Sequence, residues 1–592
     1  MSILSTLLNF WRRPAVQYAA AFLLLALLIL GVHHTALVGG LFMDDYAHFQ
    51  QLEESDWSLA GLTDACRLEL IGGVAEIWFL PECTLRFFRP LAFGLMKLTY
   101  TLADWDPFAM HAASLAWHLL TCTLLAVLLR RLGAAPWLSW GVAGLFAIHP
   151  GQITPVQWLA CQTELMVTSF LLAATLCYLR FRGWSEPDDV FLRRPRPPYA
   201  WAVAALLFFA AALGCRENAI AFPFVMLPLE FLLRKRFSRH VAAFYAAAGL
   251  IVVAYLWLRS AALAGMSLPP YPYVYHPGDP GFLRFIFDKT LYYLLGEFLL
   301  APIVPFGGLP YLRARPFLFY LLATLVLILI LAVSLRFFRR RPGLLAPAWL
   351  VGFMAPVLPA FSSPHHLYLP GIGWAIIVML LLRGIGGHPA TSHPRQALMW
   401  LCIISLGAGF SGATLAFGVA FDTAQRVEDQ VAAEIISVAD RIQDGDTLYI
   451  ANLPMIAHYT RLTVEHQTGR RDLKVRPLTW APRVLGLVGT SIETEITWID
   501  ERTIIIRVVG DRYFSGPMGR LVAQASGNPT PQHSAEWAAQ HGFTAEVIEA
   551  DADGIVAIRF TFERPLTDPG IHLFWGSRVR WAMKLNPAAE HE

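Results

Sequence analysis

Long runs of apolar residues, separated by short polar segments, dominate the first 420 positions of the chain. The runs lie at about 16–38, 108–129, 136–149, up to Arg180, 199–214, up to Arg234, 241–260, 316–335, 343–361, 367–383 and 397–419. A helix needs roughly 20 mainly apolar residues to cross a bilayer. The pattern therefore predicts a polytopic α-helical membrane protein with about eleven transmembrane helices in residues 1–420.

The basic residues in the connecting segments predict how these helices are oriented. Arg12 and Arg13 precede the first run, and the other Arg and Lys clusters between runs all fall on the same side of the predicted membrane. Cytoplasmic loops carry an excess of Lys and Arg. We expect a cytoplasmic N-terminus and large outer loops at 40–107 and 261–315. An apolar piece at about 290–306 breaks this alternation if it is counted as a span, so we interpret it as a re-entrant or surface-lying helix.

The pattern changes at about residue 424. An amphipathic helix is predicted over 423–442, and period-two alternation then predicts strands, which are typical of a half-buried sheet. The strand-like stretches are 447–450, 473–475, 492–498, 503–508 and 554–562. With eleven spans before it, residues 424–592 form a C-terminal extracytoplasmic α+β domain, which is periplasmic if the membrane is a bacterial inner (plasma) membrane.

Composition agrees with this class. Only 15% of the residues are charged, against roughly 25% in soluble proteins, and the mean hydropathy is +0.49. The net charge of +3 is small for 592 residues, which gives no reason to expect a nucleic-acid partner. The seven cysteines show no metal-ligand spacing, and Cys66 and Cys83 share the first outer loop, where a disulfide is possible.

Asp44 and Asp45 directly follow the first apolar run, and His48 lies close behind them. Ionisable residues at a membrane boundary are costly and mark functional sites by default. A carboxylate there can act as a general base. Two alternatives stay open: the acidic pair simply begins a solvated loop, or Asp44, Asp45 and His48 bind a divalent metal ion.

Further polar residues gather at the same predicted outer boundary. They are Arg89, His149, Glu164, Arg216, Glu217, His365, His366 and Tyr368. Each also has a purely structural explanation. His149 can end a helix, Arg216 and Glu217 can form a helix-end ion pair of small energetic weight, and the two adjacent histidines can lie in a solvated loop.

The ordered series resembles the GT-C class of membrane glycosyltransferases, and in particular the branch of protein O-mannosyltransferases and their transmembrane-and-TPR relatives. The resemblance covers about residues 1–420. It rests on Phe42-Met43-Asp44-Asp45, Phe88-Arg89-Pro90-Leu91, His111 with His118, Leu145 to Pro150, Val156-Gln157-Trp158, Arg216-Glu217 and His366-Leu367-Tyr368-Leu369-Pro370.

The resemblance implies an inverting transferase whose donor is a sugar on a polyprenyl phosphate in the lipid bilayer. The acceptor is a protein, lipid or glycan outside the cytoplasm. By this resemblance Asp44 or Asp45 is the base, with a slight preference for Asp44. Arg89, Arg216 and the histidine pair, together with Arg313 or Arg315, are candidates for stabilising the leaving phosphate.

The chain departs from the family pattern in three places. His365-His366 stand where the relatives commonly have Glu-Arg, Arg216-Glu217 stand where Lys-Glu is usual, and the β-rich domain replaces the TPR array. Protonated histidine could take over the phosphate contact of the missing arginine. The alternative function is a transporter or flippase of lipid-linked sugars, which favours inverted repeats; the sequence shows no such repeat.

Overall fold

The computed structural model describes residues 13–68, 78, 85–183, 198–233, 237–264, 273–301, 303, 308–337, 342–386, 393–438, 442–481, 493–515, 535–577 and 583–585. Cys83, half of the expected disulfide, lies outside these residues. The chain divides into two compact units. The first contains residues 1–40, 88–264 and 280–421, and the second contains 41–87, 265–279 and 422–592.

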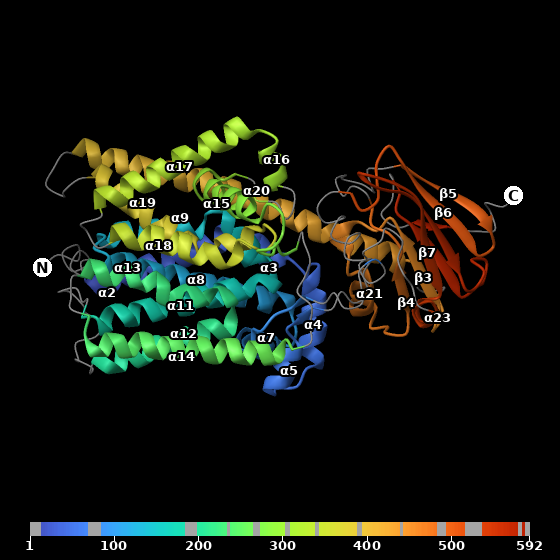
Figure 1. The fold of residues 1–592 in the computed structure, drawn as a ribbon, viewed down its shortest axis with the longest axis horizontal. Coiled ribbons are helices and arrows are strands. Elements are labelled where there is room, and N and C mark those ends of the chain that lie inside the picture. The colour runs from blue at the N-terminus through green and yellow to red at the C-terminus, as the bar shows by residue number, and fades with distance from the viewer. Residues whose placement is uncertain are drawn as a thin grey trace, which may run out of the picture. The chain divides into compact units, whose positions relative to one another are not determined.

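The first unit is helical (Figure 1). Its helices are α2 (Pro14–Val32), α3 (His34–Val38), α7 (Pro90–Leu102), α8 (Pro107–Arg131), α9 (Pro136–Ala147), α10 (Ile153–Gln157), α11 (Gln162–Phe181), α12 (Pro198–Cys215), α13 (Phe222–Leu233), α14 (Arg239–Ala262), α15 (Phe282–Leu299), α16 (Gly308–Arg313), α17 (Pro316–Phe337), α18 (Pro342–Met354) and α19 (Gly371–Gly386). The long helix α20 (His393–Ile436) belongs to this unit up to Phe421.

Prolines set where many of these helices begin. Pro14, Pro90, Pro107 and Pro136 each occupy the first turn of a helix, where the missing N–H has no intrahelical partner to lose. Asp106 also caps α8 by accepting a hydrogen bond from the Phe108 N–H at 3.3 Å. The local sequence thus defines helix ends that the apolar runs alone leave vague.

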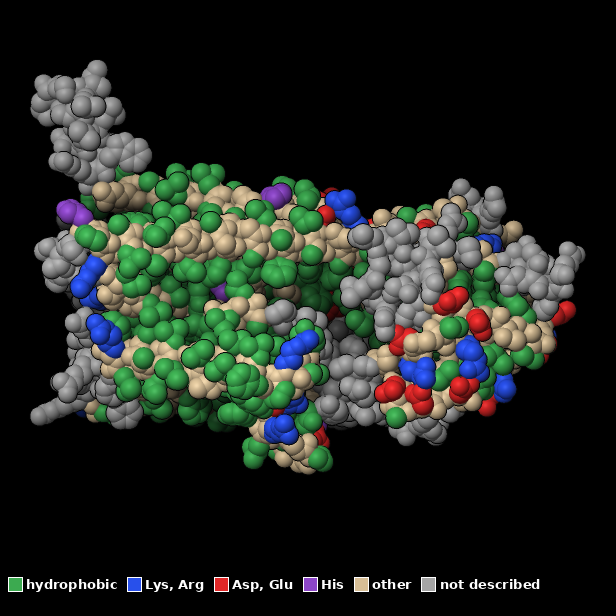
Figure 2. Space-filling model, turned by 90° about the horizontal axis from the view of Figure 1, so that it is seen from above, with side chains coloured by type: hydrophobic (Ala, Val, Ile, Leu, Met, Phe, Trp, Pro, Cys, Tyr) green, Lys and Arg blue, Asp and Glu red, His purple; other side chains and the backbone are tan. Residues whose placement is uncertain are grey.

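Among the described residues, six helices are long and apolar enough to cross a membrane: α2, α8, α14, α17, α20 and the segment Leu159–Phe181. Three shorter apolar helices span Tyr199–Cys215, Gly343–Val357 and Gly371–Gly386. Hydrophobic side chains cover most of the face of this unit seen in Figure 2. The expectation of a multi-pass membrane protein is confirmed at this level, whereas the count of eleven spans stays a prediction, because α9 and α13 have only 12 residues each.

Helix α15 occupies most of the apolar piece that broke the charge alternation. It begins at Phe282, earlier than expected, and ends at Leu299. Its middle, including Asp288, Lys289 and Glu297, is buried, and it packs against α16, α17 and α19. This burial is against other helices of the unit, so whether α15 is re-entrant or lies at the membrane surface stays a prediction.

The described residues of the second unit form two four-stranded sheets and one short two-stranded pair. One has the order β10-β9-β3-β4, with β3 (Thr447–Ala451) parallel to both β4 (Lys474–Pro477) and β9 (Ile571–Trp575), and β10 (Met583–Leu585) antiparallel to β9. The other is antiparallel with the order β5-β6-β8-β7, from β5 (Glu493–Asp500), β6 (Thr503–Val509), β8 (Gly554–Phe562) and β7 (Phe543–Asp551). Helix α21 (Thr460–Thr468) connects β3 to β4, and α23 (Ala535–His541) precedes β7.

Residues from the predicted first outer loop belong to this second unit. They form α4 (Asp44–Glu54), α5 (Leu59–Asp64) and the short pair β1 (Arg67–Leu68) and β2 (Leu85–Arg86). Trp78 is fully buried in the core of the unit, and its indole N–H donates to the carbonyl oxygen of Leu478 at 3.0 Å. The unit therefore includes more of the chain than the expected domain at 424–592.

Candidate active site

The predicted site residues fall into two sets, one in each unit. Arg89, His149, Glu164, Arg216, Glu217, His365, His366 and Tyr368 belong to the helical unit, whereas Asp44, Asp45 and His48 belong to the second unit.

Four charged residues of the helical unit form two ion pairs. Arg216 Nε lies 3.1 Å from Glu164 Oε1, and the two side chains are 7% and 0% exposed. Arg216 Nη1 also donates to Thr163 Oγ1 at 2.8 Å. Glu164 lies in the first turn of α11, where the helix dipole favours a negative charge. The predicted neighbours Arg216 and Glu217 thus do not pair with each other.

Glu217 pairs instead with Arg89. Arg89 Nε lies 3.2 and 3.1 Å from the two carboxylate oxygens, and its Nη2 lies 2.9 Å from Oε2. Burial alone would raise the pKa of Glu217, but the Arg89 guanidinium and Arg216 outweigh it and hold this pKa below its usual range. The pair is only partly buried, with side chains 11% and 28% exposed. Of the two arginines, Arg89 is the more accessible.

The histidine pair is buried, so the alternative of a solvated loop is wrong. The rings of His365 and His366 lie 4.3 Å apart. His365 Nδ1 lies 2.7 Å from Ser363 Oγ, and His366 Nδ1 lies 2.9 Å from the hydroxyl of Tyr293. That hydroxyl accepts the Ser363 N–H at 3.2 Å, so we assign its proton to His366 Nδ1.

Helix α15 holds the loop that carries these histidines. Lys289 Nζ donates to the carbonyl oxygens of Val357, Leu358 and Phe361 at 2.8, 3.2 and 3.1 Å, and also to that of Ala360. Sequence reasoning missed both Lys289 and Tyr293. Lys289 could have been found from the sequence, because it lies beside an apolar run and a lysine that is buried there needs hydrogen-bond partners.

Burial lowers the pKa of His365 and His366 well below the usual value of about 6.5 for histidine, and the nearby cations Arg216, Arg89 and Lys289 lower both further. Both rings are therefore neutral near pH 7. The expected phosphate contact by protonated histidine is not supported, although a neutral ring N–H can still donate a hydrogen bond.

The lowered pKa values of His365 and His366 predict that the stability of the folded protein depends on pH. A lowered pKa in the folded state means that the unfolded chain binds protons first, so the contribution to stability is complete above about pH 6.5 and is lost as the pH falls. We expect the thermal midpoint to fall between pH 7.5 and 5.5, and to fall less in a His365→Gln/His366→Gln variant. The exposed His34 provides the matched control, His34→Gln. Equal pH dependence in all three proteins would contradict the assignment.

His149 and Tyr368 are held by packing. His149 Nδ1 accepts the Gly151 N–H at 3.1 Å, its Nε2 lies 3.2 Å from the Glu297 carbonyl oxygen, and its ring packs against Trp374 and Phe410. The Tyr368 hydroxyl lies 2.7 Å from His118 Nδ1, and both side chains are fully buried. A supporting role, in which they shape the site without touching substrate, fits both residues.

Asp44 and Asp45 begin helix α4 in the second unit. The Phe42 carbonyl accepts the Asp45 N–H at 3.0 Å, and Asp45 Oδ2 accepts the Phe42 N–H at 3.1 Å. Between them Met43 has φ 49° and ψ −119°, as at the first central position of a type II′ turn, where glycine is preferred. Such a conformation costs on the order of 1–3 kcal/mol in a residue with a side chain.

The metal hypothesis finds no support in the described part of the chain. No three His, Cys, Asp or Glu side chains there lie close enough together to bind a metal ion. Asp45 is one of the three candidate ligands, and one of its carboxylate oxygens already accepts the Phe42 N–H within its own turn. The residues present therefore do not fit a metal centre, and no step below is assigned to one.

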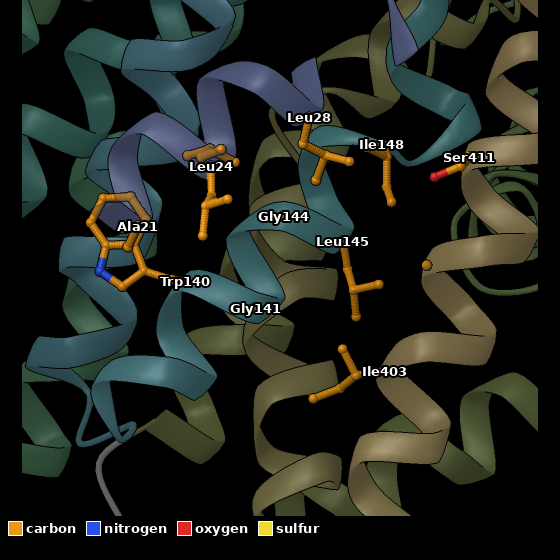
Figure 3. Close-up of a pocket in the computed structure, with 12 residues that line it drawn as sticks. Ala21, Leu24, Leu28, Trp140, Gly141, Gly144, Leu145, Ile148, Ile403 and Ser411 are labelled. Atoms are coloured by element: carbon orange, nitrogen blue, oxygen red, sulfur yellow. The ribbon is translucent and has the colours of Figure 1, made fainter. Parts of the chain in front are cut away.

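An apolar pocket of about 370 Å³ lies among α2, α9 and α20 in the helical unit. Figure 3 shows Leu24, Leu28, Trp140, Leu145 and Ile403 around it. Gly141 and Gly144 leave room for it, and its lining contains none of the charged residues described above. This pocket is separate from the candidate site.

No protein-family model matches the chain. It is 27% identical to Protein O-mannosyl-transferase TMTC3 of Mus musculus over 148 residues, which are 24% of this chain and 15% of that protein. The Homo sapiens protein of the same name gives 27% over 150 residues, again 24% and 15%. The aligned part thus spans about 15% of the curated relatives' length. These relatives agree with the resemblance to O-mannosyltransferases stated from the motifs.

Solved structures give a more distant likeness. ArnT from Cupriavidus metallidurans in the apo state is 14% identical, with a TM-score of 0.44 over 78% of this chain and 90% of that one. Archaeal oligosaccharyltransferase AglB from Archaeoglobus fulgidus, in complex with an inhibitory peptide and a dolichol-phosphate, is 13% identical. Its TM-score is 0.41 over 78% of this chain and 64% of that one.

Proposed function

We propose that this protein is an inverting glycosyltransferase of the GT-C type. It transfers a sugar from a polyprenyl-phosphate carrier to a protein, lipid or glycan at the outer side of the membrane. The sequence relationship to an O-mannosyltransferase over 148 residues supports the reaction class. The proposed location is the plasma (bacterial inner) membrane, with a cytoplasmic N-terminus and a periplasmic or extracellular C-terminal domain.

The observation that carries the proposal is that two Arg–Glu ion pairs, Arg216–Glu164 and Arg89–Glu217, join predicted site residues inside a unit of apolar helices. Charged side chains are rare in such surroundings and mark functional sites by default. Arg216–Glu164 is almost fully buried, whereas Arg89–Glu217 is partly exposed. Arg89 is the more exposed of the two arginines, so we assign the phosphate contact to its guanidinium and a structural role to the Arg216–Glu164 pair.

The proposed reaction forms one bond and breaks one bond. The acceptor hydroxyl oxygen attacks the anomeric carbon while the bond from that carbon to the phosphate oxygen breaks on the opposite face, so the configuration inverts. The acceptor proton moves to the Asp44 carboxylate as general-base catalysis. Negative charge grows on the leaving polyprenyl phosphate, where guanidinium groups stabilise it. Arg89 is our first candidate, with the exposed Arg315, whose guanidinium lies 4.2 Å from the Tyr311 ring centroid, as a second.

The test uses the full chain in lipid nanodiscs with synthetic polyprenyl-phosphate sugars that differ in the sugar. We expect one donor to release polyprenyl phosphate in step with a glycosidic product of inverted configuration. Donor movement between leaflets of liposomes without cleavage of the sugar–phosphate bond would contradict the proposal and favour a flippase instead.

A further inference from the structure

The turn that presents Asp44 is strained, and its geometry needs an external restraint. The Asp45 N–H donates to the Phe42 carbonyl oxygen, which closes the turn. The dihedral angles of Met43 then put this residue at the position of the turn where glycine is preferred. A methionine avoids this conformation when it is free to relax. Something outside the turn must therefore favour it.

Glu428 supplies a restraint from the far end of the chain. Its Oε2 accepts the Met43 N–H at 2.9 Å, across 385 positions of sequence. Its Oε1 accepts a hydrogen bond from Thr463 Oγ1 at 3.0 Å. Glu428 is 1% exposed and Thr463 is fully buried. Helices α20 and α21 thus fix a carboxylate that binds the strained peptide group directly.

The two aspartates of the turn have different surroundings. Asp45 is 3% exposed, and one of its carboxylate oxygens accepts the Phe42 N–H within the turn. Asp44 is only partly buried. A base must reach the acceptor hydroxyl, and Asp44 is the more accessible of the two carboxylates.

We infer that Glu428 is a positioning residue that holds the Met43 peptide in its strained turn and thereby orients the Asp44 carboxylate. Asp45 supports the same turn from within. The inference rests on the proposed function for its effect on catalysis, but the restraint on the turn can be measured without any activity assay. It also gives the C-terminal part of the chain a role in the reaction.

The test is a double-mutant cycle between Glu428→Ala and Met43→Gly in the full chain. Loss of Glu428 is expected to lower kcat by about 100-fold, as misplacement of a reacting group by about 1 Å can do, with KM for the donor changed much less. Glycine adopts the turn without strain, so Met43→Gly is expected to restore about tenfold of the lost kcat. Glu428→Gln keeps an acceptor oxygen for the Met43 N–H and is expected to remain within a few-fold of the parent. Asp429→Asn, at the exposed neighbouring position, is the matched control.

Thermal midpoints of the four proteins in the cycle give the second readout. Met43→Gly is expected to raise the midpoint of the parent, in which Glu428 holds the strained turn, more than that of a folded Glu428→Ala protein, in which the turn can relax. If Glu428→Ala does not fold, recovery of folding by Met43→Gly supports the inference, and no recovery overturns it. Unchanged kcat in Glu428→Ala, or a loss that Met43→Gly does not relieve, also overturns it. A parent protein inactive with every donor would refute the proposed function, while coupled midpoints would still uphold the restraint on the turn.

Discussion

Asp44→Asn lowers kcat for sugar transfer by about 10²–10⁴-fold, the usual contribution of a general base. The amide cannot take the proton of the acceptor hydroxyl, while its size and its place at the start of α4 are preserved. KM for the polyprenyl-phosphate donor should change little, because Asp44 acts on the acceptor. The measurement is initial rates over a range of donor and acceptor concentrations.

The variant Asp45→Asn tests which of the two carboxylates acts as the general base. Its amide oxygen can still accept the Phe42 N–H, so the turn persists and the expected loss is about tenfold or less. Glu54→Gln, at an exposed position of the same helix, controls for loss of an acidic charge. Full activity in Asp44→Asn would refute the assignment of the base, and a larger loss in Asp45→Asn would move that role to Asp45.

Arg216→Met destabilises the protein by about 3–5 kcal/mol, because it leaves the Glu164 carboxylate buried without its cationic partner. The side chain of Glu164 is fully buried, so water cannot replace the guanidinium. Thermal or denaturant unfolding in detergent micelles measures the change. Arg426→Met, which removes an exposed ion pair with Asp422, is expected to cost at most about 0.5 kcal/mol.

The double variant Arg216→Met/Glu164→Leu separates stability from catalysis. Replacing both members of a buried ion pair by apolar residues is often close to neutral for stability. We therefore expect the double variant to recover most of the lost stability. Recovered stability with low kcat would assign the Arg216–Glu164 pair to the reaction, and recovery of both would make the pair structural. Unchanged stability in Arg216→Met alone would contradict the buried ion pair.

Local patterns predicted much of the fold. Each long apolar run yields a helix, and the alternating stretches become β3, β4, β5, β6 and β8. The strands β1, β2, β7, β9 and β10 were missed. All five residues of β9 are buried and show no alternation, and its partner β3 lies more than a hundred positions earlier in the chain. A strand that is buried on both faces has no period-two alternation of apolar and polar residues.

For the candidate site, the sequence by itself determined which residue types stand at the ends of the apolar runs. It also determined that the acidic pair, the arginines and the histidines follow one another in a family-like order. Only the tertiary structure decided their partners: Arg89 pairs with Glu217, Arg216 pairs with Glu164, and the histidines are buried and neutral. The support from Lys289 and Glu428 also appeared only there. The physical reason is that apolar periodicity is a local property of the chain, whereas the charge state and partner of a side chain depend on which distant segments exclude water from it.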